Sequence, residues 1–363
     1  MNITIAGAGV IGCAIAHELA ALGARVRVLD SRGPGGGATR ASAGILAPYI
    51  EGHDPVMLAL GVRSLDLYDE FIRRVTTDAG REVEYERDGT VEVAMTLEEA
   101  MALRRRARML TGIGIDHSLL DAGDVRRLEP EITPAAVAGL HVRGHGYVAA
   151  AELTRALTSV AMRHGAAFDV GTVASVASDS VARVRTADAV IESDAVIIAA
   201  GSWSTGLGGV DVVPEAVRPI RGQLLQLRLP RRCAGHVIWG SDCYLVARRD
   251  GSVLAGATVE DVGFDERATS SGVQELLARA LALMPALRDA AFEEVRVGLR
   301  PKTRDELPAV GASSTMPHVF YATGHYRNGV LLAPLTARLV ADLVLDGKAD
   351  DSLTRLQPRR LGL

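Results

Sequence analysis

Residues 3–30 read ITIAGAGVIGCAIAHELAALGARVRVLD and contain the pattern G-x-G-x-x-G at residues 7–12. The apolar residues before these glycines suit a short strand, residues 10–22 repeat with helical spacing, and residues 25–29 alternate like a second strand. In such a unit the glycines permit a tight turn, backbone contact with a pyrophosphate and close packing of helix on strand. Asp30, at the end of the second strand, is placed to accept hydrogen bonds from an adenosine ribose. The segment therefore predicts a bound dinucleotide in a Rossmann-type, doubly wound α/β fold.

The composition is that of an ordinary globular enzyme. The chain has 363 residues, 48% of them hydrophobic and 23% charged, with a formal net charge of -4. This length predicts two domains, and this charge argues against a general nucleic-acid binder. Cys13, Cys233 and Cys243 have no metal-ligand spacing and no paired motif, which predicts buried thiols in a reducing cytoplasm. No run approaches the roughly 20 apolar residues of a membrane-spanning helix, and no basic segment of a signal peptide precedes the glycines.

The rest of the chain predicts alternating helices and strands. Helices are expected at residues 62–75, 97–111, 152–164, 270–283 and 330–345. Strands are expected at residues 89–94, 166–176, 195–200, 218–229, 243–247, 252–258 and 319–322. The fully apolar strand at residues 195–200 is typical of a buried parallel sheet, whereas the strands between 218 and 258 favour antiparallel pairing. We therefore expect a discontinuous nucleotide-binding domain (residues 1–85, 146–216 and 300–363) with an inserted, mainly antiparallel substrate-binding domain (residues 86–145 and 217–299).

Three further segments favour FAD over NAD as the dinucleotide. Residues 35–44 read GGGATRASAG and resemble the segment with which flavin oxidases cover the pyrophosphate and reach the isoalloxazine ring; a plain flexible loop is the alternative. The strand at residues 195–200 continues into Gly201-Ser202-Trp203, which resembles the A-x-G-x-W stretch of the same enzymes. Residues 322–334 read ATGHYRNGVLLAP, a strand, a glycine turn and a helix start, whose N-terminus is suited to stabilising negative charge on a reduced flavin.

These segments, spread from residue 3 to residue 334, together resemble the D-amino-acid-oxidase superfamily of FAD-dependent oxidoreductases. Within it, GHYRNGVLLAP at 324–334, GLRP at 298–301 and CYLVARRDG at 243–251 look most like the glycine oxidases of thiamine biosynthesis. The resemblance implies oxidation of glycine or a similar small amino acid to an imine and then a 2-oxo acid, with release of ammonia and hydrogen peroxide. It also implies non-covalent FAD, since Gly298 stands near the position where relatives with attached flavin carry a cysteine.

The resemblance assigns three residues to the substrate. Arg300 would bind its carboxylate through the planar guanidinium fork, Tyr244 would add a hydroxyl, and Arg327 would line the site near the flavin. Both arginines have apolar sequence neighbours, where an unpaired charge is costly; surface ion pairs are the alternative for the arginines, and a core position for the tyrosine. Asp242 and Ala247 depart from the pattern of the family and leave the shape of the substrate pocket open.

The same resemblance implies a set of cofactor contacts. The residues expected to bind FAD are Gly7, Gly9, Val10, Ile11, Gly12, Asp30, Ser31, Thr39, Arg40, Ser42, Ala43, Gly44, Val173, Ala200, Gly201, Trp203, Arg300, Arg327, Asn328, Gly329, Val330 and Leu331. No metal is expected, and His141, His145 and His325 are interpreted as structural.

Other functions remain open at this point. A D-amino-acid dehydrogenase or a sarcosine-type amine oxidase would have the same fold with another amine or electron acceptor. An NAD-dependent dehydrogenase would use the N-terminal glycines alone and would leave residues 35–44 and 323–329 without a role. A non-catalytic flavin-binding subunit of a larger complex is the third alternative. The expected partners are a small amino acid and dioxygen, with no nucleic acid and no membrane span; self-association is left open.

Overall fold

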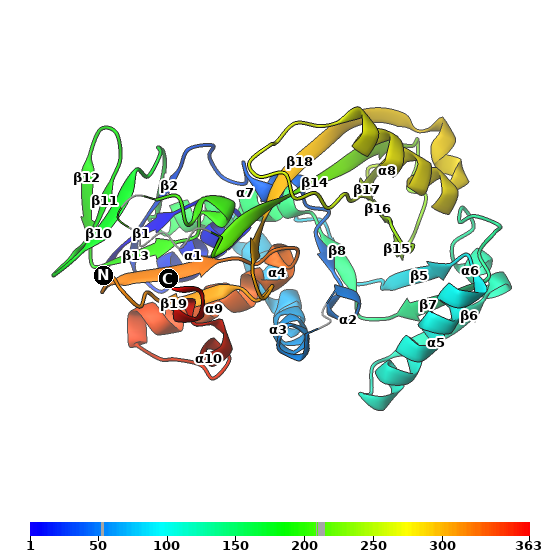
Figure 1. Ribbon diagram of the computed structural model, residues 1–363, viewed down its shortest axis with the longest axis horizontal. Helices are drawn as coiled ribbons and strands as arrows, with labels where there is room; N and C mark the ends of the chain where they lie inside the picture. The colour runs from blue at the N-terminus through cyan, green and yellow to red at the C-terminus, as the bar shows by residue number, and fades with distance from the viewer. Residues whose placement is uncertain (52–53, 208, 210–214) are drawn as a thin grey trace.

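A mostly parallel six-stranded sheet contains the N-terminal strand at its centre. The computed structural model describes residues 1–51, 54–207, 209 and 215–363. In spatial order the strands are β19 (Ala309–Ala312), β20 (Val319–Thr323), β13 (Ala195–Ile198), β1 (Asn2–Ala6), β2 (Arg25–Asp30) and β9 (Ala167–Val170). All neighbours run parallel except β19 and β20. This sheet, on the left of Figure 1, confirms the predicted α/β class.

Both faces of this sheet are covered by other elements. Successive side chains of a strand point to opposite faces and therefore enter two separate cores. Ala195 and Ile197 pack with the helices, whereas Val196 and Ile198 pack on the opposite side. The helical layer consists of α1 (Val10–Ala21), α3 (Pro55–Asp66), α4 (Tyr68–Ala79), α7 (Ala150–Arg163) and α9 (Gly329–Asp346). The opposite layer is a small antiparallel sheet of β10 (Ser175–Ser178), β11 (Ala182–Arg185) and β12 (Val190–Ser193), with the C-terminal η4 (Pro358–Leu361) beside it, whereas the buried leucines of α10 (Leu353–Leu356) belong to the core of the helical layer.

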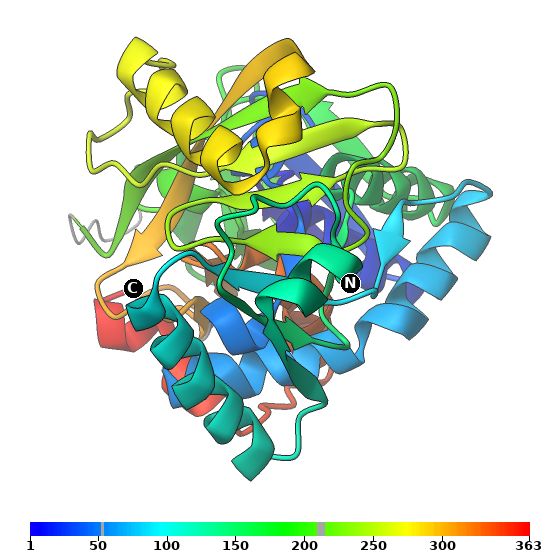
Figure 2. The same ribbon diagram turned by 90° about the vertical axis from the view of Figure 1, so that its right-hand side faces the viewer.

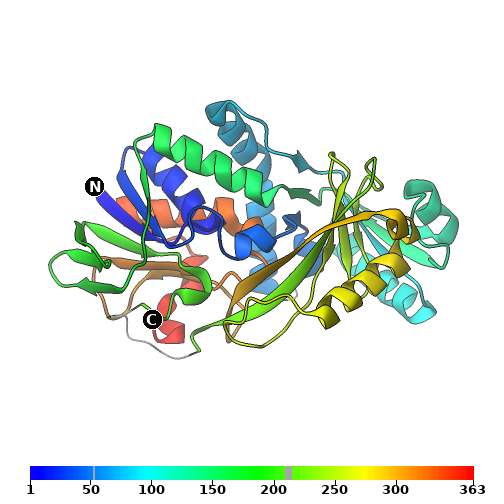
Figure 3. The ribbon, with the colours of Figure 1, turned by 90° about the horizontal axis from the view of Figure 1, so that it is seen from above.

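An eight-stranded sheet forms the other side of the molecule (Figures 1 and 3). In spatial order it contains β18 (Ala291–Thr303), β14 (Val217–Arg228), β17 (Ser252–Gly256), β16 (Tyr244–Ala247), β15 (Val237–Trp239), β5 (Thr90–Ala94), β7 (Ala138–Val142) and β6 (His117–Asp121). Figure 2 shows its flanking helices, α8 (Ser270–Leu283) and η3 (Pro285–Asp289) in yellow and α5 (Leu97–Gly112) and α6 (Ala122–Leu128) in teal. Its strands come mainly from the two segments predicted for the substrate domain; the domain division itself stays a prediction.

Two long strands, β14 and β18, connect the regions of the two large sheets (Figure 3). They pair antiparallel from Val217 opposite Thr303 to Arg228 opposite Ala291, with one register irregularity between Gln226 and Leu227. Between the two regions lies a three-stranded sheet of β3 (Ile45–Leu46), β8 (Gly146–Val148) and β4 (Tyr85–Glu86), with the short α2 (Pro48–Glu51) and the 3₁₀ turns η1 (Ala38–Ala41) and η2 (Gly201–Trp203).

Most predicted elements agree with the observed ones to within one to three residues, and the helix at 270–283 agrees at both ends. Two element predictions are wrong. The single helix expected at 62–75 is two helices, α3 and α4, which are separated at Leu67. The strand expected at 166–176 is β9 and β10, which belong to different sheets, because the chain leaves the first sheet at Gly171, whose N–H donates to the carbonyl of Asp30.

Within the described residues, no helix is both long and apolar enough to cross a membrane. The three cysteines are free and buried, as predicted.

Candidate active site

A cavity of about 400 Å³ lies at the carboxyl ends of β1, β2, β13 and β20 and extends to β14, β16 and β18. Ligands of open α/β sheets bind at this edge. Nineteen predicted site residues line the cavity: Gly7, Gly9, Val10, Ile11, Asp30, Ser31, Thr39, Ser42, Ala43, Gly44, Val173, Ala200, Gly201, Trp203, Tyr244, Arg300, Arg327, Gly329 and Val330. The structure thus brings together segments that are more than 300 positions apart in the sequence.

The turn after β1 leaves no room for a side chain at Gly7 or Gly12. Gly7 has φ +111°, and a Cβ there would lie 2.4 Å from the carbonyl oxygen of Ala199. A Cβ on Gly12 would lie 2.0 Å from the carbonyl oxygen of Gly7. Helix α1 begins at Val10 with Gly9 as its N-cap, no side-chain cap and no acidic residue in its first turn. Its N-terminal partial positive charge therefore faces the cavity, as a pyrophosphate requires.

Asp30 lies at the end of β2, where its carboxylate organises the surrounding backbone. Oδ2 accepts the N–H of Ala8 at 2.8 Å, and Oδ1 accepts the N–H of Arg32 at 2.7 Å. Each carboxylate oxygen has a second lone pair for a ribose hydroxyl. The residue therefore fixes the glycine turn and remains suited to the predicted adenosine contact.

Arg32 closes the same part of the cavity and was missed by the sequence analysis. Its guanidinium lies 4.5 Å from the ring centre of Trp203 and donates to both carboxylate oxygens of Glu266 at 2.7 Å. The ring of Phe264 lies 5.6 Å from the same tryptophan. These contacts join β2 and η2 to the segment that follows β17, 234 residues away from Arg32. No local motif signals such a distant partner.

Small residues shape the middle of the cavity. Gly44 has φ +74°, and a Cβ there would lie 1.8 Å from the carbonyl oxygen of Val148. A Cβ on Gly298 would lie 2.8 Å from the Cβ of Ala41 and 3.2 Å from the Cα of Ala38. At both positions neighbouring atoms occupy the place of a side chain, so these segments of the cavity wall pack closely, and a cysteine side chain at position 298 would collide with η1.

The N-terminus of α9 borders the cavity through Gly329 and Val330. Its N-cap, Asn328, makes no side-chain cap, and the first turn has no acidic residue. The preceding His325 is buried, with Nε2 3.0 Å from Oγ1 of Thr336, and burial lowers its pKa to about 3. A neutral His325 therefore adds no charge beside this helix end, whose partial positive charge remains available to an anion.

Arg300, on β18, is the partly buried cation of the substrate side. Nη1 donates to the carbonyl oxygen of Thr258 at 2.9 Å and lies 3.5 Å from that of Arg221. Among the described residues, no carboxylate lies within ion-pair distance of its guanidinium, and neither Nε nor Nη2 has a hydrogen-bond partner. A half-buried guanidinium that lines a cavity without an anion is arranged for an anionic ligand.

Tyr244 and Arg327 complete the predicted substrate residues. Tyr244 begins β16, is partly buried and has its ring 5.3 Å from that of Trp239. Arg327 is exposed, with its guanidinium 5.2 Å from the ring centre of Tyr326. Arg327 therefore has apolar sequence neighbours but an exposed side chain at the edge of the cavity.

Four predicted cofactor residues do not line the cavity. Gly12 lies behind the turn, where it allows α1 to approach Gly7. Arg40 is exposed and pairs with Glu294. Asn328 lines a second, smaller hollow, and the backbone carbonyl of Leu331 accepts a hydrogen bond from Ser64. Across the part of the chain that the structure describes, no group of His, Cys, Asp or Glu is placed to hold a metal ion.

Comparison with known proteins agrees with this geometry. The family model described as "DAO: FAD dependent oxidoreductase" matches residues 2–343. Glycine oxidase from Geobacillus kaustophilus is 34% identical to this chain in an alignment that covers 94% of this chain and 92% of the relative. A crystal structure of glycine oxidase from that organism superposes on this structure with a TM-score of 0.91 and 33% sequence identity, and the superposition covers 96% of this chain and 95% of that one.

Two other relatives carry names that give a different activity, and the first of them is also much longer than this chain. The Bifunctional protein ThiO/ThiG of Nostoc sp. is 35% identical over 99% of this chain, which spans 55% of that protein. A crystal structure of iminodiacetate oxidase from Chelativorans sp. BNC1 has a TM-score of 0.91 at 29% identity and covers 98% of both chains.

Proposed function

Because this chain belongs to the DAO family of FAD-dependent oxidoreductases, we propose that it is a glycine oxidase that forms the imine used to build the thiazole ring of thiamine. The overall reaction converts glycine, dioxygen and water into glyoxylate, ammonia and hydrogen peroxide. Similarity to glycine oxidase over 94% of the chain and to the ThiO/ThiG protein over 99% of it supports the proposal. An NAD-dependent dehydrogenase is not favoured, since the matching family uses FAD.

One observation carries the substrate assignment: Arg300 has its guanidinium at the cavity without a carboxylate partner among the described residues. Its planar fork matches an α-carboxylate. Arg327 also lines the cavity and adds a second positive charge to it. Positive charge in the cavity attracts the carboxylate and also favours the neutral form of the substrate amine over the ammonium form.

The residues that line the cavity hold and orient the reactants. When bound, FAD accepts a hydride equivalent from the substrate Cα and passes the electrons to dioxygen. The glycine turn, the N-terminus of α1 and Asp30 would hold its pyrophosphate and adenosine, while the N-terminus of α9 would face negative charge on its ring.

The described residues that line the cavity include two groups with the chemistry of a base, Asp30 and His325. Asp30 is bonded to backbone N–H groups of the glycine turn, and burial lowers the pKa of His325 to about 3 while its Nε2 faces Thr336. Neither is arranged to abstract a proton from carbon. This supports a reaction in which the lone pair of a neutral substrate amine drives transfer from Cα and the protein supplies orientation and charge.

We also propose that the protein works in the cytoplasm with a small amino acid and dioxygen as its partners. The three buried free thiols support a reducing compartment.

A substrate screen tests the proposed function. Purified protein, supplied with FAD, is assayed for peroxide release with glycine, sarcosine, iminodiacetate, D-alanine and ethylamine. We expect the highest kcat/KM with glycine, and a much lower value with ethylamine, because it lacks the carboxylate. Glycine turnover by the isolated chain would also exclude a non-catalytic subunit. A clear preference for sarcosine or iminodiacetate would contradict the glycine assignment, and a lack of peroxide with rapid reduction of an artificial acceptor would indicate a dehydrogenase.

A further inference from the structure

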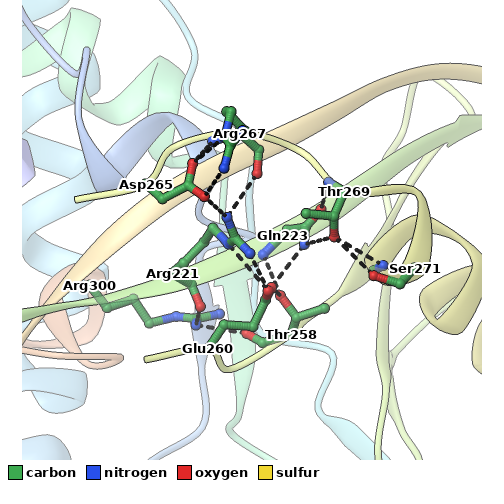
Figure 4. A network of polar contacts seen from close by, with 10 residues as sticks. Arg221, Gln223, Thr258, Glu260, Asp265, Arg267, Thr269, Ser271 and Arg300 are labelled. Carbon is green, nitrogen blue, oxygen red and sulfur yellow. Dashed lines mark hydrogen bonds and ion pairs between the residues drawn. The ribbon is translucent and has the colours of Figure 1, made fainter. Parts of the chain in front are cut away.

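A buried arginine, Arg221, lies directly beside the substrate side of the cavity. It is part of β14 and is 4% exposed. Its guanidinium contacts three groups of the segment that follows β17: Nη2 lies 2.5 Å from Oε2 of Glu260, Nη1 lies 2.9 Å from Oδ2 of Asp265, and Nη1 donates to the carbonyl of Arg267 at 3.2 Å. Figure 4 shows these contacts converging on one side chain.

Polar side chains extend this arrangement around Glu260. Its Oε1 accepts from the hydroxyl of Thr258 at 2.6 Å and from Nε2 of Gln223 at 2.8 Å. Gln223 also donates its backbone N–H to Oγ1 of Thr258 and accepts the N–H of Thr269 through Oε1. We call Arg221, Gln223, Thr258, Glu260, Asp265, Arg267 and Thr269 the Arg221 network. Both carboxylates in it are engaged with Arg221, so neither serves as a partner of Arg300.

The Arg221 network fixes the two carbonyl groups that hold Arg300. Arg221 and Glu260 form a backbone bridge, with N–H to carbonyl distances of 2.9 and 3.0 Å, and the N–H of Thr258 donates to the carbonyl of Gln223. The carbonyls of Thr258 and Arg221 are the acceptors that face Nη1 of Arg300. In Figure 4 the guanidinium of Arg300 lies alongside these two residues.

Gly222 provides the surface on which this guanidinium rests. A Cβ on Gly222 would lie 2.3 Å from Cζ, Nη1 and Nη2 of Arg300 alike, which places it over the face of the planar group. Gly222 lies opposite Gly298 in the β14–β18 pair and does not have a positive φ. Alanine is therefore compatible with the backbone at position 222 but not with the observed place of the guanidinium.

We infer that Arg221 is a positioning residue for the substrate carboxylate, acting through Glu260 and the Thr258 carbonyl on Arg300, and that Gly222 keeps the adjacent space open. This inference rests on the proposed function, since it takes the carboxylate of the substrate as the ligand of Arg300. Without the network, the guanidinium retains its charge but loses the fixed orientation that a two-point contact requires.

Strand β14 offers a matched control. Arg218 lies on the same strand and pairs with Asp261 of the same segment at 2.6 Å, but its side chain is 45% exposed and forms no hydrogen bond with Thr258 or Arg300. Arg218→Gln therefore removes an ion pair between the same two elements while leaving the Arg300 site intact. Arg221→Lys keeps one positive charge for Glu260 but loses the second arm that reaches Asp265.

The experiment compares Arg221→Gln, Arg221→Lys, Gly222→Ala and Arg218→Gln in the FAD-loaded enzyme. Glycolate, a carboxylate without an amine, is titrated while the visible spectrum of bound FAD is followed, and kcat and KM are measured with glycine. For Arg221→Gln we expect glycolate Kd and glycine KM to rise by about 10-fold or more, the scale of one charge-assisted contact, with FAD content unchanged and a smaller effect on kcat. The glycolate Kd and glycine KM of Arg221→Lys should lie between those of Arg221→Gln and the parent, and those of Arg218→Gln should equal the parental values.

Two results would overturn the inference: parental glycolate affinity in folded Arg221→Gln, or equal losses in Arg221→Gln and Arg218→Gln. If Arg221→Gln does not fold, the glycolate affinity of Gly222→Ala tests the inference instead. We expect weaker glycolate binding in Gly222→Ala, because the added Cβ displaces the guanidinium of Arg300. Parental glycolate affinity in this variant would contradict the proposed place of the guanidinium. The proposed function fails separately. If the parent binds glycolate but does not oxidise glycine, the positioning role is still read from the titration; if it oxidises glycine and Arg221→Gln behaves as the parent does, only the positioning role is wrong.

Discussion

At the scale of the residue, Arg300 differs from Arg32 and Arg221, two other arginines at or beside the cavity. Arg32 is neutralised by Glu266 and Arg221 by Glu260 and Asp265, whereas Arg300 is held by carbonyl oxygens that leave its charge uncompensated. A protein tolerates such a half-buried charge where a ligand completes it. Whether the charge of each arginine is neutralised depends on which carboxylates the fold places beside its guanidinium.

Replacing Arg300 tests its role as the carboxylate anchor. Arg300→Ala should lower kcat/KM for glycine. The fall should correspond to a loss of about 2–5 kcal/mol of transition-state binding free energy, which is what removing one partner of a partly buried charge pair costs. Arg300→Lys keeps the charge without the fork and should lie between Ala and the parent. Both variants should retain FAD, and oxidation of ethylamine should change little. Near-parental kcat/KM for glycine in Arg300→Ala would remove the substrate assignment.

Asp30 has two tasks, because it holds the N–H groups of Ala8 and Arg32 and faces the cavity. Asp30→Ala should weaken FAD binding by roughly 1.5–3 kcal/mol, the scale of a charged hydrogen bond, with activity restored by added FAD. The control is Asp169→Ala on the adjacent strand β9, a half-exposed carboxylate that pairs with Arg27. Equal FAD dissociation constants for the two variants, measured by fluorescence recovery of released flavin, would mean that Asp30 merely ends a strand.

At the scale of the element, the contact between β18 and η1 depends on one glycine. The Cβ of Ala41 leaves no room for a side chain at position 298. Gly298→Ala should therefore push the two elements apart, at a cost of about 1–3 kcal/mol in unfolding free energy, and should lower FAD content. Gly112→Ala at the end of α5 is the control, since a Cβ there meets nothing within 4 Å. Denaturant unfolding and the ratio of flavin to protein absorbance measure both effects, and unchanged values in Gly298→Ala would contradict this packing.

Elements were predictable from the sequence where the signal is local. The glycine turn after β1, the buried strand β13 and helix α8 each show their pattern within a short window. The division between α3 and α4 was missed because apolar spacing continues through Leu67. The end of β9 was missed because it is set by where the pairing with β2 stops, at the bond from Gly171 to Asp30. Local periodicity has no information about such a partner.

In the candidate site, too, residues of local motifs were predictable from the sequence and residues with distant partners were not. Residues of short motifs, such as Gly7, Asp30 and Arg300, were identified and line one cavity. The Arg221 network was not found, because Glu260 lies 39 residues beyond Arg221 and no spacing rule connects them. Gly222 gave no signal for a similar reason, since the atoms that would collide with its Cβ belong to Arg300 on the neighbouring strand.

At the scale of the whole molecule, the described residues include three almost completely buried histidines, His17, His145 and His325, that are held in the neutral form. Burial lowers the pKa of His17 to about 4 and the pKa of His145 and His325 to about 3, and all three are at most 2% exposed. The unfolded chain, in contrast, binds a proton at each of them near pH 6.5. Stability should therefore be full above about pH 6.5 and be lost as the pH falls toward the folded-state pKa values.

The expected slope is measurable between pH 6.5 and 5, where aspartate and glutamate of the unfolded chain are still ionised. Each buried histidine should contribute about 1.4 kcal/mol of lost stability per pH unit, so the three together give a fall of several kcal/mol. Urea unfolding at fixed FAD concentration gives the values at pH 7, 6 and 5. His325→Gln should reduce the slope by about one third, and an unfolding free energy that does not change across this window would contradict the neutral, buried state of these side chains.

The long β14–β18 pair also determines where the chain tolerates a change of length. Side chains alternate across a strand, so the insertion or deletion of one residue reverses the face to which every later side chain points until a bulge absorbs the error. Gly222, Gly298 and Arg300 all lie on the cavity side of the irregularity at Gln226 and Leu227, with no other register shift between it and the ends at Val217 and Thr303. A one-residue insertion on this side therefore turns Arg300 away from the cavity, whereas an insertion beyond the irregularity leaves it in place. We therefore expect gaps and insertions in relatives of this sequence to be confined to the far end of the pair.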